Sequence, residues 1–225
     1  MNPSGTTNCR RAALTLALAW LAVPAAAGTI TGKVEMIDKG GRRATDLSDV
    51  IVYVDGPKAK GRSERVTMAM KNKEFRPRVV AVPVGGAVDF PNEDPIFHNV
   101  FSVSGANRFD LDLYKRPKSG SWTFTAAGVA RVYCNIHPQM SAVVLVRDNP
   151  YFTTVAADGS FTIDHVPAGK WQLKAWQERA PEVVQEVVVG ADNKVTAQLT
   201  LDATQFRRAQ HKNKFGKDYK TDERY

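Results

Sequence analysis

The chain has 225 residues, of which 43% are hydrophobic and 24% are charged, and its formal net charge is +8. This composition is ordinary for one or two globular domains. Residues 205–225 hold seven Lys or Arg against three Asp or Glu, and residues 1–27 hold two Arg and no acidic residue. The 22 basic and 20 acidic residues that remain give the body of the chain a nearly balanced charge of +2. That balance argues against a nucleic-acid-binding protein.

The first 27 residues have the layout of a secretory signal peptide. Arg10 and Arg11 precede the apolar run AALTLALAWLAV, and three alanines before Gly28 form a cleavage pattern. The run is shorter than the roughly 20 residues that a membrane span needs. We therefore predict cleavage, no transmembrane segment in the mature chain, and a periplasmic or secreted location. A Sec-type route is predicted, because the twin-arginine match is weak.

Alternating β-branched and aromatic residues, interrupted by Gly, Pro, Asn and Asp, predict strands along the rest of the chain. No amphipathic helix of several turns is evident, so the predicted fold class is all-β, of the sandwich type. Asp158-Gly159 predicts a hairpin turn. In chain order, the predicted strand regions are 29–37, 49–54, 65–70, 79–84, 87–90, 122–127, 130–134, 141–146, 151–163, 170–178, 182–190 and 194–201.

The simplest division has four parts: a signal peptide (1–27), a first β domain (28–148), a second β unit (149–202) and a basic tail (203–225). The second unit is short for an independent core. In the alternative division, residues 28–60 complete the C-terminal sandwich, and the first domain is an insertion that begins near residue 62. The polar tail is expected to be disordered, with a basic charge that suits an acidic partner or a membrane surface.

Cys134 is the only cysteine that remains after signal cleavage removes Cys9. No disulfide can then form within the mature chain, although export delivers it to an oxidising compartment. An exposed thiol is open to oxidation there. Cys134 is therefore expected to be either buried and inert or bound to a metal ion.

The stretch VYCNIHPQM combines a thiol, an imidazole and a thioether at Cys134, His137 and Met140. Upstream, AVDFPNEDPIFHNVFS places His98 in a polar turn between two strand-like runs. Crossed-over strands bring the ends of distant strands together at one pole of a sandwich, so His98 is expected to meet the other three. Two imidazoles, a thiolate and an axial thioether suit one mononuclear copper ion in electron transfer, whereas zinc usually needs a fourth strong donor.

Several motifs between residues 64 and 148 resemble those of cupredoxins of the amicyanin, plastocyanin and pseudoazurin kind. They are Phe75-Arg76-Pro77, VPVGGAVDFPN, His98-Asn99-Val100, and Tyr133-Cys134 followed by His137 and Met140. The resemblance implies a Greek-key cupredoxin sandwich with type 1 copper held by His98, Cys134, His137 and Met140. It also implies that the Asn99 N–H is directed at the Cys134 sulfur, and that the Asn99 side chain ties the two ligand loops together.

Two further stretches resemble known groups. FSVSGANRFDLDLY is similar to secreted cupredoxin-like proteins that are labelled methylamine-utilisation proteins. TVAADGSFTIDHVPAGKWQLKAW is similar to carboxypeptidase regulatory-like domains, which are small Ig-like β-sandwiches. GKVEMIDKGGRRATDLSDVIVYVDG resembles the opening strands of the same type, which favours the insertion. Such domains are usually non-catalytic spacers or interaction modules.

The predicted function is an exported copper protein, not an enzyme, that carries one electron between a transient redox donor and acceptor. The electron is expected to pass through an exposed edge of His137, with an apolar rim from Pro95, Phe97 and Pro138. Two alternatives stay open. One is a copper carrier or sensor whose metal loading controls partner binding by the regulatory-like unit. The other is an interaction module with a structural metal.

A copper enzyme of the nitrite reductase or multicopper oxidase class is disfavoured on residue counts. Such an enzyme needs a further copper site built largely from histidines. Only His165 and His211 remain after the two candidate ligands, and both are predicted to be structural or solvated.

Overall fold

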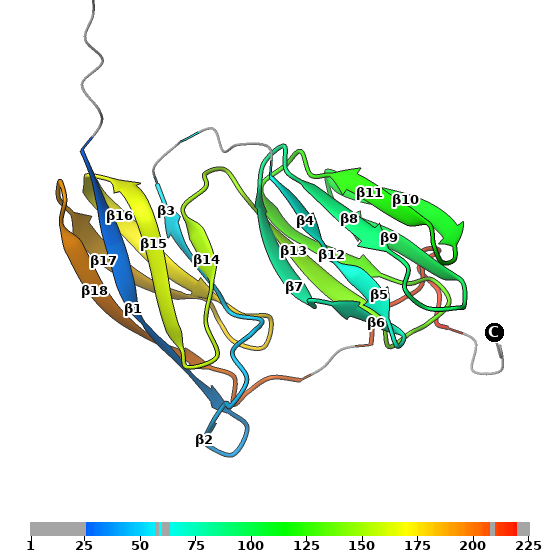
Figure 1. Cartoon of the computed structure of the whole chain (residues 1–225). Coiled ribbons are helices and arrows are strands. Elements are labelled where there is room, and N and C mark those ends of the chain that lie inside the picture. Colours follow the sequence, from blue (N-terminus) through cyan, green and yellow to red (C-terminus); the bar gives the residue numbers. More distant parts are fainter. Residues whose placement is uncertain (1–25, 57–58, 60–63, 208–209, 220–225) are drawn as a thin grey trace, which may run out of the picture.

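The computed structural model describes residues 26–56, 59, 64–207 and 210–219. Within them every regular element is a β-strand, and the strands form two β-sandwiches that lie side by side (Figure 1). The predicted all-β sandwich class is therefore confirmed. No helix in this part of the chain is long and apolar enough to span a membrane. Nearly all of the predicted signal peptide, residues 1–27, lies outside the described residues.

The first sandwich runs from β4 to β13 and has two facing layers. One layer is a five-stranded sheet in the order β10-β9-β12-β13-β7, and the other is a three-stranded sheet in the order β11-β8-β4. The β7–β13 and β4–β8 pairs are parallel, so long connections cross between the layers. The bounds are β4 Arg65–Thr67, β5 Ala69–Lys71, β6 Glu74–Arg76, β7 Val79–Pro83, β8 Ala87–Pro91, β9 His98–Ser104, β10 Asn107–Tyr114, β11 Ser119–Thr123, β12 Gly128–Tyr133 and β13 Ser141–Arg147.

The second sandwich combines strands from both ends of the chain. One sheet has the order β15-β1-β18, with β2 at the edge of β1, and the other has the order β14-β3-β16-β17. The bounds are β1 Ala27–Asp38, β2 Arg42–Arg43, β3 Ile51–Asp55, β14 Phe152–Thr154, β15 Ser160–Pro167, β16 Gly169–Trp176, β17 Val183–Val189 and β18 Lys194–Asp202.

Strand pairing places residues 27–55 in the C-terminal sandwich, so the first domain does not begin at residue 28. β1 pairs along its length with β15 and β18, and β3 pairs with β14 and β16. The first sandwich is inserted between β3 and β14, which are antiparallel neighbours. The Val54 N–H donates to the Tyr151 carbonyl at 2.8 Å, beside the point where the insertion leaves and returns.

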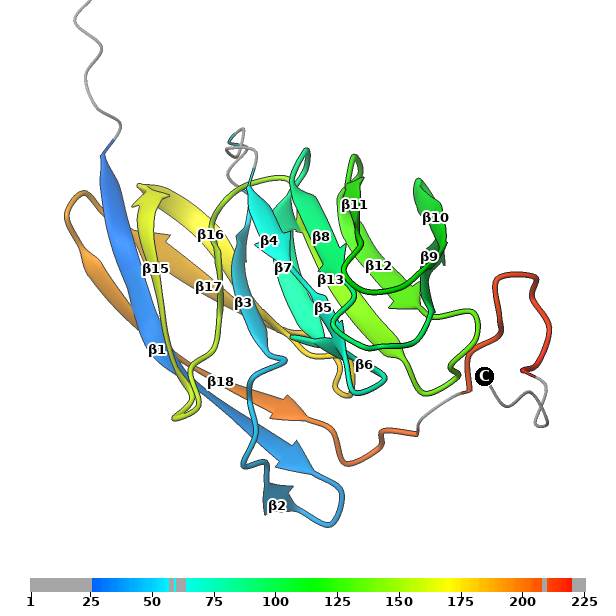
Figure 2. The same ribbon diagram turned by 45° about the vertical axis from the view of Figure 1, so that its right-hand side comes forward.

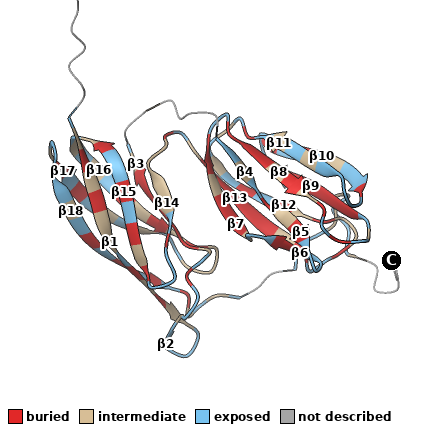
Figure 3. Cartoon of the chain, in the orientation of Figure 1, coloured by how far each residue is buried: buried red, intermediate tan, exposed pale blue. Residues whose placement is uncertain are grey.

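The two sandwiches share an apolar interface because β3 and β13 are buried on both faces. In β3, Val52 and Val54 face the core of the second sandwich, whereas Ile51 and Tyr53 face the first sandwich. Figure 3 shows the same extensive burial along β7 and β13. A strand that is buried on both faces has a continuous hydrophobic sequence without polar alternation, and these strands have such sequences. The interface cluster consists of Ile51, Tyr53, Val79, Val143 and Leu145, with Ala81, Phe152 and Trp176 packed against it.

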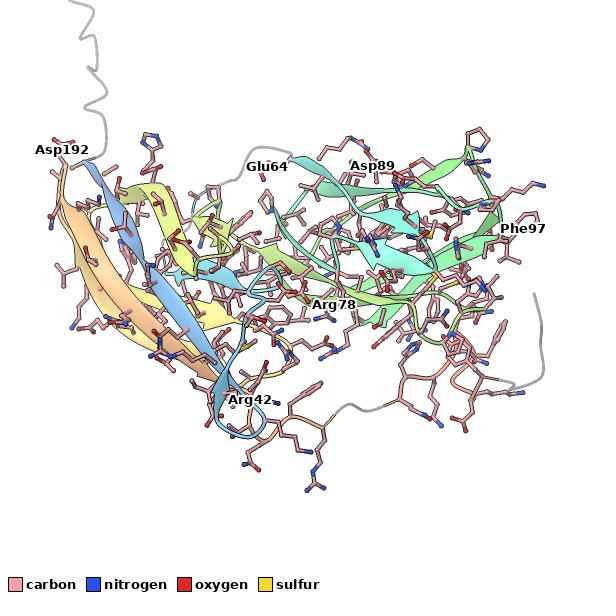
Figure 4. All side chains as sticks on the ribbon, turned by 60° about the horizontal axis from the view of Figure 1, so that its bottom comes forward. Arg42, Glu64, Arg78, Asp89, Phe97 and Asp192 are labelled. Atoms are coloured by element: carbon pink, nitrogen blue, oxygen red, sulfur yellow. The ribbon has the colours of Figure 1, made fainter. Side chains whose placement is uncertain are left out.

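Charged groups join the sandwiches beside this apolar interface. Arg78 lies between them (Figure 4) and donates to Asp49 and Glu178 of the second sandwich, each at 2.6 Å. Glu178 also accepts from Arg131 of β12. Burial raises the pKa of Glu178, but the Arg78 and Arg131 guanidiniums outweigh it and hold that pKa below its usual value. Glu178 therefore stays ionised and ties both arginines to the second sandwich.

Two local expectations differ from the structure. Asp158-Gly159 does form a turn, in which Gly159 has φ +85°, but β14 and β15 on either side belong to different sheets. The turn is therefore an arch between sheets and not a hairpin. The tail also differs, because residues 210–219 lie against the far end of the first sandwich instead of extending as a disordered end (Figures 1 and 2).

Candidate metal centre

The loop between β12 and β13 carries three of the predicted ligands and closes on itself. The Cys134 N–H donates to the Met140 carbonyl at 3.2 Å, and the Met140 N–H donates to the His137 carbonyl at 3.0 Å. Alternation along β12 and into Cys134 turns Val132 and Cys134 into the core and Tyr133 away from it. We call residues 134–140 the ligand loop.

His98 is the first residue of β9 and does not lie in a turn. β9 is hydrogen-bonded to β12 in the five-stranded sheet, so His98 is held beside the ligand loop. Its Nδ1 atom lies 3.0 Å from Nδ1 of His137, and the Cys134 Sγ atom lies 3.6 Å from the same His137 atom. One donor atom from each of these three residues falls within 4.8 Å of the others, and all three side chains are buried. The structure thus brings together residues from two separate segments.

Met140 is also buried next to this group. Its side chain is 0% exposed and belongs to the same apolar cluster as Cys134. Its position at the end of the ligand loop is compatible with an axial thioether. That role stays a prediction.

Asp94 orients His98, a contact that the sequence reasoning missed. Its carboxylate lies 2.8 Å from Nε2 of His98 and accepts the N–H groups of Asn72 and Lys73 at 2.7 and 2.9 Å. Burial raises the pKa of Asp94, but these three partners together hold it below its usual value. An ionised carboxylate keeps a proton on Nε2, which leaves the Nδ1 lone pair of His98 facing the site. The one sequence feature that could have indicated this contact is the position of Asp94 four residues before His98 in PNEDPIFH.

Asn99 shows one of its two implied contacts. Its backbone N–H is directed at the Cys134 sulfur, with 3.5 Å between N and Sγ. The Asn99 side chain does not tie the ligand loops together. It donates to the Asp110 carboxylate at 2.7 Å and to the Asp112 carbonyl at 3.0 Å. The cause is an irregularity in β10, where the register shifts between Asp110 and Leu113 and brings these oxygens towards β9.

The protonation of the site suits a metal ion. Burial lowers the pKa of His137 to about 4, and the neighbouring His98 and Lys73 side chains act in the same direction to a smaller extent. His137 is therefore neutral at pH 7. Burial also raises the pKa of the Cys134 thiol, although the N–H groups of Asn99, Ile136 and His137 oppose this. A bound cation is what converts such a thiol to the thiolate.

Hydrogen bonding at His137 provides a test of that fit. With the His98 proton on Nε2, the contact between the two Nδ1 atoms requires His137 to donate from its own Nδ1. Its Nε2 atom would then be an acceptor, yet this atom is buried and has no hydrogen-bond partner among the described residues. The Nδ1 lone pairs of His98 and His137 would both be available to a cation, in which case neither ring would need to donate to the other and His137 would carry its proton on Nε2. The residues present therefore fit a metal ion.

Acidification should destabilise the metal-free protein through His137. Between pH 6.5 and 4 the unfolded state binds the proton and the folded state does not, so stability is full above pH 6.5 and falls as the pH is lowered. Urea unfolding at pH 7 and pH 4.5 should show a loss of about 2 kcal/mol that His137→Asn reduces. His165→Asn, at an exposed site, is the control. Equal acid losses in both variants would contradict the assignment.

The expected exposed edge of His137 is not present. The residue is only 6% exposed. Phe97 is 49% exposed at the end of the first sandwich (Figure 4), so part of the predicted apolar rim does face solvent.

His165 is exposed in β15, as expected. His211 has a structural contact, one of the two roles expected for it, since its Nε2 atom lies 2.7 Å from the Pro138 carbonyl of the ligand loop.

Comparisons with known proteins give partial matches. Residues 118–197 match the family described as polysaccharide lyase family 4, domain II, which is about a third of the chain. This stretch starts in the first sandwich and ends in the second. No curated protein matches the chain.

Among solved structures, the copper-containing nitrite reductase from Thermus scotoductus is 29% identical over 36% of this chain, with a TM-score of 0.34. This chain spans 22% of that reductase. The reduced Cu(I) form of a mutant of amicyanin is 23% identical, with 43% of this chain and 98% of that chain covered and a TM-score of 0.35. A purple cupredoxin from Nitrosopumilus maritimus is 19% identical, and the match covers 51% of this chain and 98% of the cupredoxin, with a TM-score of 0.30. These scores are low, so a metal assignment depends on the donor atoms described above.

Proposed function

We propose that this chain is an exported, cupredoxin-like copper protein that carries single electrons between redox partners. One observation carries the proposal. The donor atoms of His98, Cys134 and His137 come from two segments of the chain and meet within 4.8 Å in a buried site. A thiolate with two imidazoles is a donor set that selects copper, and the buried thioether of Met140 adds a weak soft donor.

Each residue has a separate task in this proposal. His98 and His137 offer neutral Nδ1 atoms, Cys134 offers its sulfur, and Asp94 fixes the orientation of His98. Copper held by them supplies a one-electron couple between Cu(I) and Cu(II). The surrounding chain keeps water out, because all four candidate ligands are at most 6% exposed. Donors that barely move need little reorganisation when the charge of the site changes.

The shape of the site favours electron transfer over catalysis. A cleft of about 1240 Å³ lies beside the ligand loop, but Tyr133, Pro138 and Gln139 line it, and none of the four candidate ligands does. A substrate in that cleft would not reach the donor atoms. Electron transfer needs no such access, and redox proteins commonly meet through small, transient interfaces. The proposed donor and acceptor are proteins of this kind.

Copper loading tests the proposal directly. The metal-free chain, titrated with Cu(II), should take up one equivalent and develop a strong visible thiolate-to-Cu(II) charge-transfer band. Cys134→Ser should lose the band, because an alcohol oxygen is a poor donor to Cu(II) at neutral pH. Far-UV circular dichroism should show that the variant keeps its strands. His165→Asn is the matched control and should keep the band.

The outcome also separates the electron carrier from a copper carrier. A reversible one-electron wave in protein-film voltammetry, with slow loss of Cu(I) to a chelator, supports the electron carrier. Rapid transfer of Cu(I) to an acceptor, with no reversible wave, supports the copper carrier. A fully copper-loaded wild type without a charge-transfer band would exclude thiolate ligation and remove the proposal.

A further inference from the structure

The chain after β18 returns to the first sandwich and ends its described course against the ligand loop (Figures 1 and 2). Residues 210–219 make three hydrogen bonds to that loop. His211 Nε2 lies 2.7 Å from the Pro138 carbonyl, the Lys214 N–H donates to the Asn135 side chain at 3.0 Å, and the Tyr219 hydroxyl donates to the Cys134 carbonyl at 2.8 Å. We call residues 210–219 the strap.

The strap also reaches the Cys134 sulfur by a second route. The Lys214 ammonium donates to one carboxylate oxygen of Asp110 at 2.6 Å. The other oxygen of Asp110 accepts from the Asn99 side chain at 2.7 Å. The Asn99 N–H is in turn directed at Cys134 Sγ. Lys214 thus contacts the ligand loop through its backbone and braces Asn99 through its side chain.

Aromatic packing supports these bonds. The His211 ring stacks on Tyr133, with centroids 4.1 Å apart and the planes at 21°. Tyr219 packs edge-on against His211 at 5.3 Å. Tyr133 is the residue whose ring points away from the core immediately before Cys134, so the strap covers the outer side of the ligand segment. The strap has its own internal order, since the Asn213 side chain accepts the N–H groups of Phe215 and Lys217 at 3.0 Å each.

We propose that the strap holds the ligand loop closed, and that His211, Lys214 and Tyr219 are positioning residues of the metal centre. The ligand loop carries three of the four candidate donors, so opening it separates the donors from His98. Each hydrogen bond from the strap must break when the loop opens, which slows opening. The effect on metal retention rests on the proposed function, whereas the effect on the loop does not.

Thiol labelling of the metal-free protein tests the strap without copper. In a full-length Cys9→Ser background, Cys134 is the only thiol, and its reaction with a disulfide reagent reports opening of the loop. Tyr219→Phe should speed the reaction about threefold, and the triple variant His211→Ala, Lys214→Met, Tyr219→Phe about tenfold or more. Lys217→Met is the matched control, because Lys217 is exposed in the same segment and its side chain makes no hydrogen bond or ion pair among the described residues. It should react like the wild type.

Release of Cu(I) to a chelator then tests metal retention. The triple variant should release copper about tenfold faster than the wild type, and Lys217→Met should not. Equal unfolding midpoints of the variants show that the fold is intact. If the triple variant reacts with the thiol reagent at the wild-type rate, the strap does not hold the ligand loop closed. A faster thiol reaction with unchanged copper release overturns its role in metal retention. If the wild type binds no copper, the proposed function is wrong. The thiol rates would still decide whether the strap holds the ligand loop closed.

Discussion

A chain that lacks residues 27–56 should fail to form the C-terminal sandwich, even though residues 149–202 contain five of its eight strands. β1 lies between β15 and β18, and β3 lies between β14 and β16, so each sheet loses a central strand. The core loses its apolar side chains from β1 and β3 at the same time. Trp171 and Trp176 fluorescence and amide hydrogen exchange across β15–β18 should report an unfolded segment.

The complementary chain provides the control for this deletion. Replacing residues 57–148 with a short Asn-Gly turn should leave the C-terminal sandwich folded, because β3 and β14 are already antiparallel neighbours. Protected amides in β15–β18 are expected there. Protected amides in residues 149–202 without the N-terminal strands would contradict the split domain.

Gly32→Val should cost more than about 3 kcal/mol in the free energy of unfolding. Gly32 is paired on both sides, with Phe161 of β15 and Ala197 of β18. A Cβ atom there would lie 2.0 Å from the Ala197 carbonyl oxygen and 2.7 Å from the Phe161 ring. A central strand cannot shift away from one neighbour without approaching the other. Urea unfolding followed by tryptophan fluorescence measures the loss.

Gly40→Ala is the control for that substitution. Gly40 has φ +85°, and an added Cβ would meet no atom within 4 Å. Its cost should be the left-handed backbone strain alone, about 1 kcal/mol. A Gly32→Val chain that loses no more stability than Gly40→Ala would show that the sheet relaxes around the new side chain.

Local sequence was sufficient for the all-β class and for the ligand loop. Strand alternation is a property of successive residues, so the pattern around residues 130–134 is enough to place Cys134 and Tyr133 on opposite faces. His137 and Met140 lie on the same short loop, which makes their proximity to Cys134 a local matter too. The strand β10 was missed and β9 was recognised only as the short run after His98, because FSVSGANRFDLDLY mixes polar residues and glycine into the pattern.

Tertiary structure decided which distant segments meet. Asp94 and the strap both contact the site, and the sequence gives little sign of either contact. For Asp94 the sign is a carboxylate four residues before a histidine, and for the strap it is only a polar tail. The turn at Asp158-Gly159 illustrates the same limit, since its local conformation was predictable but the sheets of its two flanking strands were not.

The sequence by itself therefore determined most of the strands, the donor types of the candidate site and the short loop that holds most of these donors. Only the folded chain decided that residues 27–55 belong with residues 149–202, that His137 is buried, and that residues 210–219 lie on the ligand loop. The physical reason is that alternation specifies which face of a strand is apolar and does not specify which other apolar face will cover it. That choice depends on the apolar surfaces that remain once every strand has paired.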